Sequence, residues 1–266
     1  AEGRCFYGHG AFDAGGRHLF MTENAFDRGA GVIGVYDTRD DYKRIGELDA
    51  GGIGPHPLLM LSDGRTLAVA VGGILTHPDS GRAKLNIDTM RPALQFIDSA
   101  SGAVVNRVAL GSEREWKLSL RHMARLADDR IIIGAQDQMN DGRRLPLVYV
   151  AGATDSNLRP LAIPDKTCER LTGYCGSLAF NPMGAMIAVS SPRGGLAALW
   201  SSATLDFLGE VDLADGCGLA SLPDRPGFLF SSGNGQLRVA TVDGADDELT
   251  RHPFRQWDNH AVAIEA

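Results

Sequence analysis

Hydrophobic and polar positions alternate along much of the chain, in short runs separated by turn dipeptides such as Asp-Gly, Ser-Gly, Gly-Gly and Asn-Gly. Alternation with a period of two is typical of half-buried β-strands. Five of these runs resemble one another, at residues 31–37, 92–98, 146–152, 196–202 and 237–243. Two alternating runs precede each of them, and a fourth follows it after a polar turn. The sequence therefore predicts a repeated unit of four antiparallel strands.

The spacing of these units indicates the architecture. Each unit opens with a strand that we expect to begin at a marker residue, and successive markers lie 47, 66, 54, 41 and 43 residues apart: His9, His56, His122, Gly176, Cys217 and His260. Four strands in roughly 40–45 residues is the period of a β-propeller blade. The interval of 66 contains an insertion at residues 72–90, between the second and third strands of the second unit. We therefore expect an all-β fold, a single β-propeller domain over residues 1–266.

The number of strands raises a question about how the ring closes. The pattern predicts five complete four-stranded blades and then a lone closing strand at residues 259–264. A propeller closes its ring to protect the sheet edges, so the lone strand needs three partner strands. Residues 1–8 are too few to supply them. We expect either that the natural protein continues upstream of residue 1 or that the ring is open.

Composition and charge narrow the function classes. Glycine accounts for 33 of 266 residues and hydrophobic residues for 44%, which is too apolar for a disordered chain and too rich in glycine for a helical bundle. No stretch approaches the roughly 18 consecutive apolar residues of a membrane span, so we expect no membrane insertion. The formal net charge of −7 argues against nucleic-acid binding by bulk electrostatics, because a phosphate backbone attracts a basic face.

The four cysteines do not form a metal-binding motif of their own. They have no CxxC spacing, so a zinc ribbon is excluded: Cys5, Cys168, Cys175 and Cys217. Cys168 and Cys175 lie seven residues apart in an expected loop. They can pair in an oxidising compartment or remain free thiols, and the sequence leaves both possibilities open. The first residues contain no basic segment followed by an apolar one, so they name no compartment.

The candidate metal ligands are the marker residues themselves. The first strand of each blade lines the central channel of a propeller, so we expect four imidazoles and one thiol to ring one mouth of the channel: His9, His56, His122, His260 and Cys217. Imidazole and thiolate suit a transition metal such as iron, copper or zinc rather than calcium or magnesium. The alternative is that each histidine solves the same packing problem in its blade, by hydrogen bonding to a neighbouring blade or to channel water.

Loops on the same face supply candidate ligand-binding residues, and loops on a rigid scaffold often carry function. These candidates are Glu23, Asn24, His77, Lys84 and Arg193. Their mixture of charges suits an anionic ligand, such as a carboxylate chelate of a metal. The alternative is a solvated charged rim.

Motifs of common enzymes are missing. Gly29, Gly31 and Gly34 form a literal GxGxxG, but the segment runs into a strand instead of opening a helix, so a dinucleotide site is not expected. The sequence contains no GxSxG, HExxH or P-loop motif. We assign no catalytic residue, and the sequence favours a protein that is not an enzyme.

Several segments are similar to one bacterial family: FYGHGAF (6–12), TENAFDRGAGVIGVYD (22–37), GIGPHPLLMLSDGRTL (52–67), GGILTHPDSGRAKLNIDTMRPAL (72–94), SPRGG (191–195) and WDNH (257–260). They resemble seven-bladed β-propellers exported by the twin-arginine route, in the superfamily of YVTN and quinoprotein amine dehydrogenase-like propellers. Genes of that family often lie beside those of imelysin-type iron-uptake proteins and di-haem oxidase-like proteins.

This resemblance implies a periplasmic location, an association with iron acquisition, and about one and three-quarter blades ahead of FYGHG. It also implies imelysin-type or di-haem periplasmic proteins as partners, and it implies no particular reaction. The family more often has GPHEL where this chain has GPHPL, so Pro57 removes one potential oxygen ligand beside His56. Cys168 and Cys175 lie outside the resembling segments.

Three functions remain at this stage. The favoured one is a periplasmic, non-enzymatic binding or scaffold protein that holds a metal, a metal chelate or a partner protein at the histidine-lined channel mouth. The first alternative is an enzyme, either a metal-dependent, lactonase-like hydrolase or a redox partner of the di-haem protein. The second is a pure protein-interaction platform.

Overall fold

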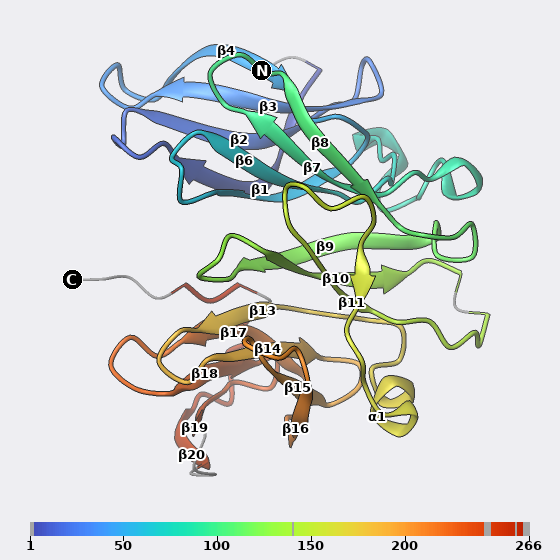
Figure 1. Ribbon diagram of the computed structural model, residues 1–266, viewed down its shortest axis with the longest axis vertical. Helices are drawn as coiled ribbons and strands as arrows, with labels where there is room; N and C mark the ends of the chain where they lie inside the picture. Colours follow the sequence, from blue (N-terminus) through green and yellow to red (C-terminus); the bar gives the residue numbers. More distant parts are fainter. Residues whose placement is uncertain (1–2, 140, 242–245, 259, 263–266) are drawn as a thin grey trace.

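The computed structural model describes residues 3–139, 141–241, 246–258 and 260–262. In these ranges the chain forms five four-stranded antiparallel sheets, and one short helix, α1 (Asp165–Arg170), lies between the third and fourth sheets. Each sheet is a simple meander in which sequential strands pair. The predicted all-β propeller of four-stranded blades is therefore confirmed (Figure 1).

The strands of each blade fall close to the predicted runs. Blade one contains β1 (Cys5–Phe12), β2 (His18–Ala25), β3 (Ala30–Asp37) and β4 (Lys43–Asp49). Blade two contains β5 (Pro55–Met60), β6 (Thr66–Val71), β7 (Ala93–Asp98) and β8 (Val104–Ala109). Blade three contains β9 (Leu118–Arg125), β10 (Ile131–Asp137), β11 (Val148–Ala151) and β12 (Arg159–Pro160). Blade four contains β13 (Leu178–Asn181), β14 (Met186–Ser191), β15 (Leu196–Ser201) and β16 (Phe207–Asp212). Blade five contains β17 (Gly216–Ser221), β18 (Gly227–Ser232), β19 (Gln236–Thr241) and β20 (Asp246–Arg251).

The blades follow one another around the molecule in chain order. Figure 1 shows blade one at the top, blade three in the middle and blade five at the bottom. The first strands β1, β5, β9, β13 and β17 contact their neighbours in that order, so they are the innermost strands. Residues on these strands therefore face the centre of the arc.

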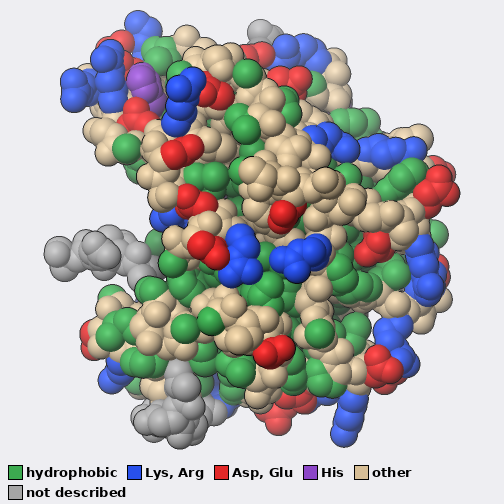
Figure 2. Space-filling model, in the orientation of Figure 1, with side chains coloured by type: hydrophobic (Ala, Val, Ile, Leu, Met, Phe, Trp, Pro, Cys, Tyr) green, Lys and Arg blue, Asp and Glu red, His purple; other side chains and the backbone are tan. Residues whose placement is uncertain are grey.

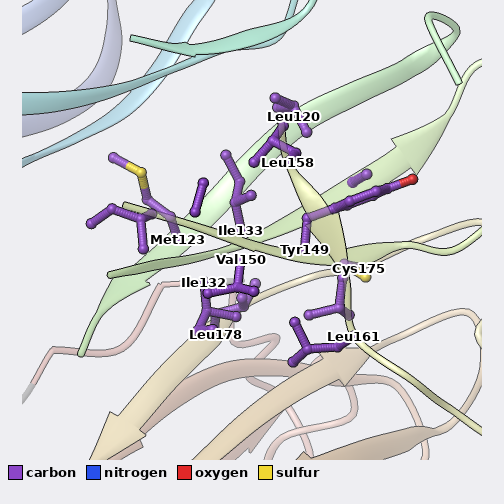
Figure 3. Close-up of a cluster of buried hydrophobic side chains, with 14 of the residues drawn as sticks. Leu120, Met123, Ile132, Ile133, Tyr149, Val150, Leu158, Leu161, Cys175 and Leu178 are labelled. Atoms are coloured by element: carbon purple, nitrogen blue, oxygen red, sulfur yellow. The ribbon is translucent and has the colours of Figure 1, made fainter. Parts of the chain in front are cut away.

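Burial follows position within the blade. The middle strands β7 and β14 are buried along their whole length, because another blade covers each face of the sheet. The outermost strand β16 alternates between partly buried and exposed residues. Figure 3 shows part of the core between blades, where Ile133 of β10, Tyr149 of β11 and Leu178 of β13 pack together. Burial of such apolar surface, at roughly 25 cal/mol per Å², stabilises the stack of sheets.

The predicted insertion in blade two is an ordered loop. It contains two short 3₁₀ turns, η1 (Pro78–Ser80) and η2 (Ile87–Thr89). The side chain of Asn86 closes the loop, because its Nδ2 donates to Gly73 O at 2.9 Å and its Oδ1 accepts from Leu75 N at 2.7 Å. Asn24 of β2 donates to Thr76 O at 3.1 Å, so the loop is fastened to blade one.

The predicted closing strand at residues 259–264 lies partly outside the described residues, and the described residues 260–262 form no strand. Its position nevertheless continues the repeat. Ser190 Oγ of blade four donates to Cys217 O of blade five at 2.7 Å, and Ser231 Oγ of blade five donates to Asp258 O at 3.4 Å. The backbone oxygen of Asp258 thus accepts a hydrogen bond from blade five, as that of Cys217 accepts one from blade four.

Three further features bear on the excluded functions. Gly29 lies in the turn before β3, and Gly31 and Gly34 lie within β3, so the GxGxxG segment runs into a strand, as predicted. Among the described residues, no helix has the length and apolar character needed to cross a bilayer. Figure 2 shows Lys and Arg side chains interspersed with Asp and Glu on the visible face, without a continuous basic surface.

Candidate metal centre

Three of the innermost strands, β1, β5 and β9, have a β-bulge at a candidate histidine. The register jumps from Phe6–Glu23 to Gly10–Met21 in blade one, from Pro55–Val71 to Leu58–Val69 in blade two, and from Leu120–Ala135 to Met123–Ile133 in blade three. A bulge breaks the alternation of side chains and re-aims them. His9, His56 and His122 lie in these three bulged segments.

The bulges correct one expectation from the sequence. His9 and His122 do not begin their strands: each is the fifth residue of an eight-residue strand. His56 is the second residue of β5. The strands begin earlier because the backbone ladder continues on both sides of each bulge, which hydrophobic alternation alone does not reveal.

The four predicted histidines come together. The ring centroids are 4.6 Å apart for His9–His56, 4.9 Å for His56–His122, 5.0 Å for His122–His260 and 5.0 Å for His260–His9. One candidate ligand nitrogen from each of His9, His122 and His260 lies within 4.8 Å of the others. Residues from three blades and from the C-terminal segment thus form one group, which we call the histidine cluster.

The spacing of the cluster is close to that of a metal site. Tetrahedral zinc with Zn–N bonds of about 2.0–2.1 Å requires nitrogens about 3.3 Å apart. Donor atoms separated by up to 4.8 Å must therefore approach by about 1.5 Å, which changes of side-chain torsion angle can supply. The donor set consists of imidazoles, which suit iron, copper and zinc.

The histidines are held in the neutral form that a metal needs. Burial, together with the charges of neighbouring histidines and Arg121, lowers the pKa of His9 to about 4 and that of His122 to about 3. Burial, with the nearby Arg121, also holds the pKa of His56 well below its usual value. At neutral pH these imidazoles keep a lone pair for coordination.

Hydrogen bonding distinguishes three histidines of the cluster from His18 and His77. In the described ranges, no hydrogen bond reaches a ring nitrogen of His9, His56 or His122, and His56 Nδ1 is buried without a partner. In contrast, His18 Nδ1 lies 2.9 Å from Asp13 Oδ2, and His77 Nδ1 accepts from Asp79 N at 3.2 Å. The fourth member, His260, has its Nδ1 3.6 Å from Asp258 Oδ2. Buried polar atoms normally have partners, so His56 Nδ1 requires an explanation.

Cys217 does not join the cluster. The three-residue group of possible ligands in the described part of the chain contains only histidines. The sulfur of Cys217 lies 3.1 Å from the backbone oxygen of Asp215. Burial and the charge of Asp215 raise the pKa of this thiol to about 11, so it is not a thiolate at neutral pH. Bulged β17 carries it at the position equivalent to the histidines, but its contacts belong to its own blade.

The candidate ligand-binding residues make different contacts. Glu23 is buried and ion-paired, and Asn24 fastens the inserted loop. His77 packs edge-on against Phe26 in that loop, and Lys84 is exposed there. Arg193 stacks over the ring of Tyr174 at 4.5 Å. Asn24 and His77 thus lie where the inserted loop meets blade one, whereas Arg193 contacts Tyr174 in blade four's entry loop.

Sequence reasoning missed Arg121, which lies beside the cluster. It precedes His122 in the bulge of β9, and its charge acts on His9, His56 and His122. Its Nε is buried without a hydrogen-bond partner. In a regular strand, adjacent residues face opposite sides, so only knowledge of the bulge places Arg121 with His122.

Cys168 and Cys175 are free thiols in the structure. The Sγ of Cys168 lies 3.5 Å from Leu145 O, and that of Cys175 lies 3.6 Å from Leu147 O. Burial raises the pKa of both, that of Cys175 to about 12. Neither is a reactive thiolate.

Comparison with known proteins gives the fold and the family. A β-propeller (WD40) chain in "Crystal Structure of Mitotic Checkpoint Complex" is similar with a TM-score of 0.66 and 13% identity, over 95% of this chain and 67% of that chain. At this identity the likeness shows the fold alone. No curated protein matches the chain. A family model described as "Protein of unknown function (DUF1513)" matches residues 1–264, and the chain therefore belongs to this family.

Proposed function

We propose that this protein is a non-enzymatic binding protein that holds one transition metal ion, iron, copper or zinc, at the histidine cluster. One observation carries the proposal: of seven histidines in the chain, four converge from three blades and the C-terminal segment. Residues so far apart in sequence meet only because the propeller brings their strands to one centre.

The missing hydrogen bonds favour a metal over simple packing. A histidine that only packs in its blade would satisfy its ring nitrogens with nearby polar groups, as His18 does with Asp13 in the turn that precedes its strand. Leaving a buried acceptor without a partner costs about 1–3 kcal/mol. Coordination of an ion would use the lone pairs of several imidazoles at once.

The number of ligands separates binding from catalysis. His9, His122 and His260 bring donor atoms within 4.8 Å of one another, and His56 lies outside this group of donor atoms, with its ring next to those of His9 and His122. Four imidazoles would close a tetrahedral site, whereas three leave the position that catalytic zinc sites keep open for water. The non-enzymatic proposal therefore requires His56 as the fourth ligand, and the hydrolase and redox alternatives require that it does not bind.

The wider biological setting remains a prediction. The periplasmic location, the link to iron acquisition and the imelysin-type or di-haem partners rest on the resemblance of sequence segments such as FYGHGAF and WDNH. A role as a pure interaction platform stays open in the same way. Recovery of a specific partner by a metal-free variant would favour the platform.

Elemental analysis tests the metal directly. The protein is purified without chelator or histidine tag, and its metal content is compared with that of the double variant His9→Gln/His122→Gln. His18→Gln is the matched control, because this histidine is paired with Asp13 outside the cluster. We expect near-stoichiometric metal in the wild type and control and its loss in the double variant. Wild-type protein that neither contains nor takes up Fe²⁺, Cu²⁺ or Zn²⁺ would overturn the proposal.

A further inference from the structure

The guanidinium of Arg121 is a second unexplained group in the channel. Its side chain is partly buried, and its Nε is buried without a hydrogen-bond partner. The titratable groups that face it are His9, His56 and His122 together with the phenols of Tyr7 and Tyr174. Within the described ranges no carboxylate pairs with it.

Other arginines of the chain show how unusual this is. Arg44 contacts two carboxylates, with its Nη2 3.0 Å from Glu23 and 2.8 Å from Glu47. Arg125, four residues beyond Arg121 on β9, lies 2.8 Å from Asp129. Buried charges in proteins are normally paired, since an unpaired one loses its hydration without compensation.

A metal ion would add to the uncompensated positive charge of Arg121. Neutral imidazoles add no negative charge, so a divalent ion in the cluster and the guanidinium of Arg121 would repel each other across a partly buried space. An anion between them would offset both charges. The channel thus has the electrostatics of a site for a cation and an anion together.

We propose that Arg121 forms the anion subsite of the channel, so that the protein takes its metal together with a small oxyanion such as a carboxylate or phosphate. This inference rests on the proposed function. The planar fork of a guanidinium matches the oxygens of carboxylate and phosphate, and its charge is kept at any physiological pH. The anion is therefore an oxyanion rather than a halide.

The neighbouring residues complete the subsite. Tyr7 lies beside Arg121, and its phenol oxygen is 3.3 Å from Thr76 Oγ1 in the inserted loop. Tyr174 lies in the loop between α1 and β13, and Arg193 stacks on its ring at 4.5 Å. Both phenols thus act on Arg121, and Arg193 stacks on one of them. The subsite joins β1, β9 and the loop that leads into β13.

Zinc affinity in different salts tests the subsite. Zn²⁺ binding is measured by competition with a chromophoric chelator, in chloride and in acetate or phosphate at equal ionic strength. We expect wild type to bind Zn²⁺ about tenfold more tightly with an oxyanion, within the range usual for coupled sites. Arg121→Gln loses this dependence and binds Zn²⁺ in chloride at least as tightly as wild type. Arg121→Lys keeps part of the dependence, and Arg125→Gln behaves as wild type.

Two outcomes separate this inference from the metal proposal. If wild type binds Zn²⁺ equally in chloride, acetate and phosphate, the anion subsite is wrong and the metal site stands. If wild type binds no metal, the proposed function is wrong, and the subsite is judged on metal-free protein. In that case phosphate must raise the unfolding temperature of wild type but not of Arg121→Gln. No rise would overturn the subsite as well.

Discussion

Two groups of titratable residues in this molecule differ in how their polar atoms are paired. In blade one, Glu23 is only 2% exposed, yet it accepts from Arg44 at 3.0 Å and from the hydroxyl of Tyr36, and Arg4 lies 3.5 Å away. In the channel, the rings of His9, His56 and His122 and the Nε of Arg121 lie together without such partners.

The difference separates structure from function. In the blade-one network, hydrogen bonds from Arg44 and the charges of Arg4 and Arg28 lower the pKa of Glu47 to about 2, and every charge has an opposite neighbour. Such a network stabilises the edge of a sheet, and its charged groups are already paired with one another rather than with a ligand. In the channel, His56 Nδ1 and Arg121 Nε are buried without a hydrogen-bond partner, so an acceptor and a charged donor are both left unpaired. A binding site needs such unpaired groups to contact its ligand.

The largest expected effect is stabilisation by metal. Excess Zn²⁺ at about 1,000 times its Kd would stabilise the native state by about 4 kcal/mol, because the ion binds only the folded chain. For a chain of this size that corresponds to a rise in unfolding temperature of the order of 10 °C. Thermal unfolding followed by circular dichroism checks this. His9→Gln/His122→Gln should show no rise, and a rise in that variant equal to that of wild type would place the metal elsewhere.

Removing one charge from the blade-one network should be nearly as costly. Glu23→Gln leaves Arg4 and Arg44 with a neutral neighbour in a buried place, and breaking a buried ion pair costs about 3–5 kcal/mol. The free energy of unfolding in urea measures the loss. Glu47→Gln is the matched control, because Glu47 is more exposed and should cost about 1 kcal/mol or less. Zn²⁺ affinity should not change in either variant, and a change would contradict the separation of the two groups.

The sequence predicted the fold because the signal for a blade is repeated. Alternating runs such as residues 31–37 and 196–202 occur in the same order five times, and the middle strands need buried residues on both faces. The convergence of the four histidines also follows from the repeat, since equivalent positions in successive blades face one centre. The repeat led to Cys217 as well, but that thiol contacts Asp215 instead.

What the sequence could not predict depends on local departures from regular geometry. Arg121 faces the cluster because a bulge breaks the alternation of β9, and no residue in the segment Leu118–Arg125 marks the bulge in advance. The sequence indicates Glu23 and Asn24 as polar loop residues, typical of a ligand site, but they lie in β2. Their partners Arg44 and Thr76 lie far away in sequence, so only the folded chain shows that they are already paired.

The pH dependence of stability should distinguish the histidine cluster from the blade-one network. The folded-state pKa values of His9 and His122, about 4 and 3, lie below the usual 6.5, so the unfolded chain binds protons first as pH falls. Stability is therefore full above pH 6.5 and is lost as pH falls toward these values. His9 alone should account for a loss of about 2 kcal/mol between pH 7 and 5. Urea unfolding of metal-free protein measures it.

Two variants serve as references for this pH dependence. His9→Gln should flatten the curve between pH 7 and 5, because glutamine does not titrate. Glu47→Gln should leave that interval unchanged, because the pKa of Glu47, about 2, lies below its usual value and its effect falls between about pH 5 and 2. A steep loss between pH 7 and 5 that persists in His9→Gln/His122→Gln would mean that the acid sensitivity comes from outside the cluster.

The smallest expected effect concerns the rim of the anion subsite. Arg193 is exposed, so water and salt screen its charge at the channel. Arg193→Gln should therefore weaken the oxyanion-dependent part of Zn²⁺ binding by about twofold and leave binding in chloride unchanged. Lys84→Gln, in the exposed part of the inserted loop, should change neither. The chelator competition used for Arg121 measures both. An effect of Lys84 larger than that of Arg193 would mean that the anion approaches over the inserted loop rather than over Tyr174, since each charge acts most strongly on the ligand nearest to it.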